Sequence, residues 1–145
     1  MKREQRLRPL HELAGQTERN YALRLADCER RVAAGEQRYQ ELVRYRLEYQ
    51  QLFHARASDG APMRGLREHQ VFIARLAEAV RAQRTLLEQL RTESAQVLEL
   101  WCNAATRKQA VGKVIEHARS EEFMSQEKRQ QRELDELANQ QRMRR

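Results

Sequence analysis

Glycine, proline and aromatic residues are scarce in this sequence. The 145 residues include five glycines and two prolines, and only 6 % are aromatic. These are too few for the turns of a sheet protein or of a many-helix bundle. Alanine, leucine, glutamate, glutamine and arginine are abundant instead, and all five form helices readily. The composition therefore predicts an all-α protein with a thin core.

Long apolar runs are also missing. No segment approaches the ~20 residues needed to cross a membrane. Residues 1–8 have no apolar stretch behind them, which argues against a signal peptide. The two cysteines, Cys28 and Cys102, fit a reducing compartment and no disulfide framework. We therefore expect a cytoplasmic protein.

Residues that perform chemistry are few and scattered. The four histidines, His11, His54, His69 and His117, show no metal-ligand spacing. No Gly-rich phosphate loop, nucleophile elbow or sheltered carboxylate pair is present. We predict that the protein is not an enzyme and has no catalytic residue, cofactor or metal.

The net charge is strongly positive, at +7 with an isoelectric point near 10.0. Basic and acidic residues are interspersed along the expected helical faces, which is typical of the solvated exterior of a coiled coil. The excess of arginine can also guide docking to an acidic surface. A basic rod that binds nucleic acid remains an alternative, but the sequence shows no aromatic and basic stacking face and no basic region leading into a zipper.

One apolar seam runs through residues 66–118. Its members follow one another in an unbroken alternation of three and four steps, over about seven heptads, which predicts a coiled coil. A helix with one narrow apolar seam needs a partner helix to bury it. The seam residues are Leu66, His69, Ile73, Leu76, Val80, Gln83, Leu87, Leu90, Ser94, Val97, Trp101, Ala104, Lys108, Val111, Ile115 and Ala118.

A second seam lies upstream, in residues 3–57. We expect it to slip by one step between Tyr21 and Leu25, which would relax the supercoil locally. Its residues are Leu7, Leu10, Ala14, Thr17 and Tyr21 before the slip, and Leu25, Cys28, Val32, Gly35, Tyr39, Leu42, Arg46, Tyr49 and Phe53 after it.

Residues 58–65 separate the two seams and hold the clearest helix-breaking signal, with Gly60, Pro62 and Gly65. A short loop between two long helices makes them antiparallel neighbours. The sequence predicts a single coiled-coil domain over residues 1–145, folded as a long antiparallel two-helix coiled-coil hairpin. We place helix one at about 3–57, the tip loop at about 58–65 and a longer helix two at about 66–140.

The register of this hairpin follows from the loop position. Folding at the tip pairs residue i with about residue 122 − i. Phe53 then lies beside His69, and the small Gly35 lies beside the large Leu87. Pairing ends near Ser120, so helix two has about 25 further residues without a partner. This tail either frays or is held inside a partner protein.

The tip carries more large apolar side chains than one seam can hide. An apolar patch that stays exposed within a charged rim marks a binding surface. A slightly wide core with snorkelling tyrosines, or a face for self-association, would explain the same pattern. The stripe consists of Leu42, Tyr45, Tyr49 and Leu52 in helix one and of Phe72, Leu76, Ala79 and Gln83 in helix two.

Several short motifs occur in a recognisable order and spacing over essentially the full length. In this order the chain resembles the flagellar export protein FliJ family. The motifs are Arg6-Leu7-Arg8-Pro9-Leu10, Tyr45 with Tyr49, Leu66 with Phe72 and Leu76, Trp101, Glu127-Lys128, and Glu133-Leu134-Asp135-Glu136-Leu137-Ala138.

The resemblance implies a stalk protein of the type III export apparatus. It would be cytoplasmic and peripheral to the inner membrane at the flagellar base. In the family, the helical ends sit in the central hole of the hexameric export ATPase and promote ring assembly. A surface toward the tip contacts the cytoplasmic domain of the export-gate protein FlhA and couples the ATPase to the gate, and export chaperones are further partners. Carried onto this sequence, the export-gate-binding patch is Leu42, Tyr45, Tyr49, Phe72, Leu76 and Ala79.

Two other hypotheses are compatible with this architecture. The stalk protein of a virulence type III injectisome has the same hairpin. A homo-oligomeric filament would require the tip patch to pair with itself.

Overall fold

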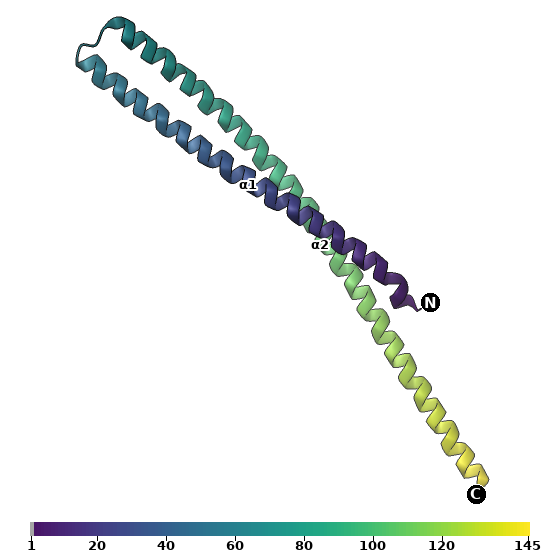
Figure 1. Cartoon of the computed structure of the whole chain (residues 1–145). Coiled ribbons are helices and arrows are strands. Elements are labelled where there is room, and N and C mark those ends of the chain that lie inside the picture. The colour runs from purple at the N-terminus through teal and green to yellow at the C-terminus, as the bar shows by residue number, and fades with distance from the viewer. Residues whose placement is uncertain (1) are drawn as a thin grey trace. The chain divides into compact units, whose positions relative to one another are not determined.

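Two α-helices account for nearly the whole chain in the computed structural model, which describes residues 2–145. Helix α1 spans Arg3–Ser58 and helix α2 spans Met63–Arg144. Figure 1 shows the loop of residues 59–62 that reverses the chain between them. The described residues contain no strand. The predicted all-α helical hairpin with a longer second helix is therefore confirmed.

The tip loop is shorter than predicted. Gly60 adopts a φ of 75°, its N–H donates to Ala57 O, and Ala61 N–H donates to Arg56 O. These two bonds and the left-handed glycine form a Schellman motif, which ends α1 abruptly. Helix α2 begins at once, because Pro62 O accepts the N–H of Leu66 at 3.2 Å.

The fold contains two compact units. One is Tyr21–Trp101, which includes the tip, and the other combines the described residues of Met1–Asn20 with Cys102–Arg145. Each unit pairs a stretch of α1 with an antiparallel stretch of α2, and we describe each by itself.

The seam predicted in α2 is confirmed along its whole length. Every one of its residues from Leu66 to Ala118 is at least partly buried. Val80, Leu87 and Val97 are among the most buried side chains of the protein. The heptad pattern thus defines the face of α2 that packs on α1.

The slip predicted in α1 is wrong. Leu10, which it requires in the core, is 53 % exposed, whereas the neighbouring His11 is partly buried. Glu4 and Glu18 are partly buried as well, and with them the alternation of three and four steps continues without a break. The sequence pattern missed this register because it followed apolar residues, while the N-terminal end of the seam uses polar ones.

Contacts in the unit Tyr21–Trp101 match the predicted register. The ring centroids of Phe53 and His69 lie 5.8 Å apart. A Cβ on Gly35 would lie 3.4 Å from Leu87 Cδ1 and only 3.2 Å from Leu90 Cδ1, so the glycine lets the two helices approach closely here. Gln83 Nε2 donates to Gly35 O at 3.2 Å, which satisfies a polar side chain within the seam.

The core of the other unit is thinner and more polar. Small residues, Ala14 and Ala104, are buried in it. Lys108 Nζ lies 4.0 Å from a carboxylate oxygen of Glu18. Pairing extends to Glu122, the last partly buried residue of α2, and residues 123–145 are all exposed.

Candidate functional site

Heptad positions place the tip stripe on one side of the hairpin. With the seam at positions a and d, Tyr45 and Leu52 occupy g positions in α1, and Phe72 and Ala79 occupy g positions in α2. In an antiparallel pair, g positions face g positions and e positions face e positions. Arg91 and Glu36, both at e, lie 3.7 Å apart and confirm this geometry in the unit that holds the tip.

The six residues of the predicted export-gate-binding patch differ in exposure. Tyr45 is 47 % exposed and Phe72 is 42 % exposed. Tyr49, Leu76 and Ala79 are partly buried, and Leu42 is buried in the core. Tyr45 and Phe72, together with the exposed Leu52, are therefore the side chains that a partner can reach most directly.

A cluster of the aromatic rings of Tyr49, Phe53, His69 and Phe72 packs beneath this surface. The rings of Tyr49 and Phe72 meet edge to face, with centroids 4.6 Å apart. His69 packs against both Tyr49 and Phe53. The buried His69 also donates from Nε2 to Tyr49 O at 2.8 Å, which ties the start of α2 to the end of α1. The cluster therefore limits the positions that Tyr49 and Phe72 can adopt.

A shallow depression lies beside Phe72 on the outer surface of α2. It has a volume of about 380 Å³ and is lined by Arg67, Glu68, Val71, Phe72 and Arg75. Only Phe72 was predicted as a site residue. The others lie outside the seam and its stripe, where the sequence has no periodic signal that would single them out.

The end of α2 forms a second candidate surface. Beyond Glu122 the helix continues to Arg144 with no side chain covered by α1. Figure 1 shows this segment running on past the N-terminus within the same unit. Its exposed apolar residues are Phe123, Met124, Leu134, Leu137 and Met143.

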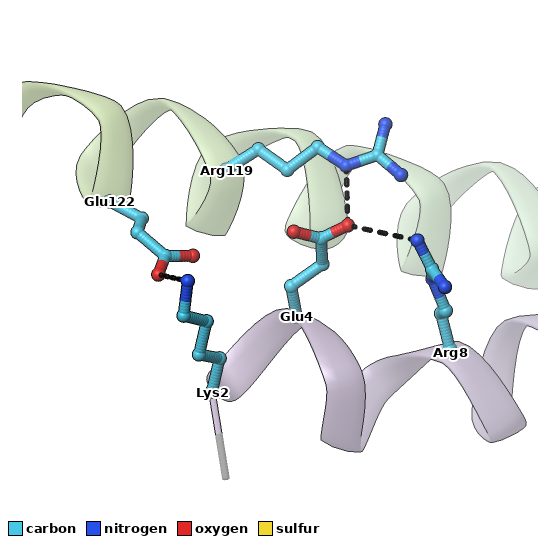
Figure 2. A network of polar contacts seen from close by, with 5 residues as sticks. All are labelled: Lys2, Glu4, Arg8, Arg119 and Glu122. Atoms are coloured by element: carbon cyan, nitrogen blue, oxygen red, sulfur yellow. Dashed lines mark hydrogen bonds and ion pairs between the residues drawn. The ribbon is translucent and has the colours of Figure 1, made fainter.

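Ion pairs join the start of α1 to α2 at the end of the paired part of this unit, as Figure 2 shows. Arg119 Nε donates to Glu4 Oε1 at 2.6 Å, and Arg8 approaches the same oxygen at 3.6 Å. Lys2 Nζ lies 2.8 Å from Glu122 Oε1. We name this group of residues the N-terminal clasp. The apolar pattern of the sequence did not reveal it, because polar side chains make its contacts, including Glu4 at a seam position of α1.

These contacts shift two pKa values in opposite directions. The hydrogen bond from Arg119, aided by its charge and that of Arg8, lowers the pKa of Glu4. The hydrogen bond and negative charge of Glu122 raise the pKa of Lys2. Both shifts favour the charged forms that make the clasp.

The described residues contain no group of three or more histidine, cysteine or acidic side chains arranged to hold a metal ion. His54 contacts the ring of Phe53, at a centroid distance of 5.9 Å. Cys28 is a buried thiol and Cys102 an exposed one, and both are free. Neither helix, over residues 2–145, has a stretch both long and apolar enough to span a membrane.

Comparison with known protein families gives a match over the whole chain. The profile of the family described as "Flagellar FliJ protein" matches residues 1–145, the whole chain. No curated protein and no solved structure matches the chain.

Proposed function

This chain belongs to the flagellar FliJ family, and we propose that it is the central-stalk component of the flagellar export ATPase complex. Membership makes it a structural component of the flagellar type III export apparatus. In the proposed role it promotes assembly of the hexameric export ATPase ring and couples the ring to the export gate. The observation that carries the proposal is the family match over the full length.

The exposed end of α2 supports the ATPase part of the proposal. A helix without a partner over residues 123–145 leaves Phe123, Leu134 and Leu137 open to water. Covering the apolar side chains of a solvated helix with a partner is favourable, by about 25 cal/mol per Å² of apolar surface removed from water. We propose that the hexameric ATPase covers this segment.

The surface at the tip supports the gate part. Tyr45 and Phe72 are large and exposed, and the ring of Phe72 packs edge to face on Tyr49 within the aromatic cluster. Aromatic side chains that are held in place lose little entropy on binding and often dominate an interface. We propose that the patch of Leu42, Tyr45, Tyr49, Phe72, Leu76 and Ala79 binds the cytoplasmic domain of FlhA, with Leu42 supporting it from the core.

Two further parts of the proposal follow from the family relationship. Export chaperones are additional partners, and the protein acts on the cytoplasmic side of the inner membrane at the flagellar base. Attachment there is indirect, through the ATPase and the gate.

The gate part is tested with the double variant Tyr45→Ala/Phe72→Ala. Both side chains are exposed, so the helices should keep their circular dichroism while affinity for the FlhA cytoplasmic domain falls at least about tenfold. Leu23→Ala is a matched control, since Leu23 is exposed outside the patch and should leave affinity within about twofold. Unchanged affinity in the double variant would refute the gate part of the proposal.

A further inference from the structure

The depression beside the tip has an apolar floor that is open to solvent. Val71 is 53 % exposed, and its neighbour Phe72 presents one side to the depression. The ring of Phe72 packs on Tyr49 at 4.6 Å, which leaves the depression continuous with the predicted gate-binding patch. A side chain bound here would therefore lie beside a partner already seated on Phe72.

Two arginines border this floor. Arg67 and Arg75 are exposed and line the depression, eight residues apart, which is about 12 Å along a helix. Neither forms an ion pair with any described residue. Glu68, between them in sequence, is already paired with Arg64 at 3.9 Å. The lining of the depression thus carries two arginines that pair with no described carboxylate, beside Glu68, which pairs with Arg64.

We propose that this depression extends the gate-binding surface and receives an apolar side chain from an acidic segment of the export-gate cytoplasmic domain. Carboxylates on either side of that apolar side chain pair with Arg67 and Arg75. This inference rests on the proposed gate binding and adds to it the chemistry of the partner segment. It assigns a role in binding to Arg67, Val71 and Arg75, which lie outside the patch.

Charge and shape favour a protein segment over other occupants. A second copy of this chain carries a net charge of +7 and would bring further arginines to the rim. A polyanion such as nucleic acid would offer phosphates to the two arginines but no apolar group to the floor. A peptide segment supplies both an apolar side chain and flanking carboxylates.

The test is the variant Arg67→Glu/Arg75→Glu of the full chain. Its binding to the FlhA cytoplasmic domain is measured by isothermal titration calorimetry at low and at physiological salt. The affinity should fall by at least about tenfold, and it should depend less steeply on salt. Arg81→Glu/Arg107→Glu makes the same change in net charge at exposed arginines outside the depression and should stay within about twofold. Val71→Ala should weaken binding several-fold without a change in salt dependence.

Each result decides between the two proposals. Equal losses in both arginine pairs would assign the effect to overall charge and overturn the inference. Suppose that Arg67→Glu/Arg75→Glu keeps full affinity while Tyr45→Ala/Phe72→Ala loses it. The role of the depression in binding would then be refuted, and the proposed export-gate-binding patch would be retained. No binding by the unaltered chain would overturn both.

Discussion

At the scale of single residues, Glu4 makes the most informative polar contact. Its carboxylate accepts the Arg119 Nε–H at 2.6 Å and joins the start of α1 to α2. The lowered pKa of Glu4 means that the folded protein prefers the ionised carboxylate. Its stabilising effect is therefore present above the ordinary glutamate pKa, about 4.3, and is lost as the pH falls through the lowered value.

Lys2 has the opposite dependence. Its pKa is raised by Glu122, so its contribution is present below the ordinary lysine pKa, about 10.4, and is lost as the pH rises through the raised value. The N-terminal clasp is thus complete across the neutral range and opens at either extreme.

Replacing Arg119 should reveal this coupling. In Arg119→Gln the pKa of Glu4 should rise toward its ordinary value, because the largest cause of its depression is removed. Titration of the Glu4 side-chain carboxyl by ¹³C NMR measures this directly. Arg8→Gln serves as the comparison and should raise the pKa less, since Arg8 lies farther away at 3.6 Å. An unchanged Glu4 pKa in Arg119→Gln would show that the clasp does not form in solution.

At the scale of the elements, two glycines near the tip have opposite roles. Gly60 needs a positive φ, and an alanine there should destabilise the hairpin by about 1 kcal/mol. Gly65 lies inside α2, and an added Cβ would meet nothing within 4 Å, so Gly65→Ala should stabilise it by about 0.4–1 kcal/mol. Urea unfolding of both variants gives the two free energies. Equal effects of the same sign would contradict the assigned Schellman turn.

Most of the helical pairing was predictable from the sequence, because heptad spacing and burial have the same physical origin. The contact of Phe53 with His69 and the approach of Gly35 to Leu87 agree with the predicted register. The polar seam at His11 was not predictable, since an apolar pattern cannot select a histidine over a neighbouring leucine. The loop was overestimated because Gly65 was taken as a breaker, although one glycine costs a helix only about 1 kcal/mol.

The candidate site was predictable only in part. A surplus of apolar residues identified the stripe. Which of these side chains can contact a partner depends on their exposure, and exposure is set by the rotation of each helix about its own axis. That rotation places Tyr45 outward and Leu42 inward. The depression between Arg67 and Arg75 depends on side-chain shape on the outer surface, where the sequence has no periodic signal.

At the scale of the whole molecule, the proposed functions divide between two separate surfaces. The export-gate-binding patch belongs to the unit Tyr21–Trp101. The exposed segment 123–145 belongs to the unit that includes Cys102–Arg145. Each surface should therefore be removable without loss of the other function. This separation distinguishes a stalk with two binding surfaces from a single extended interface.

Ending the chain after Glu122 tests this separation. Residues 123–145 are all exposed, so their removal should leave the thermal unfolding midpoint of the paired helices nearly unchanged. Stimulation of ATP hydrolysis by the hexameric export ATPase should be lost, while affinity for the FlhA cytoplasmic domain stays within about twofold. Tyr45→Ala/Phe72→Ala should show the reverse, with ATPase stimulation kept and gate binding weakened. A shortened chain that still stimulates the ATPase would mean that the ring binds the paired helices, because the unpaired end would then be dispensable.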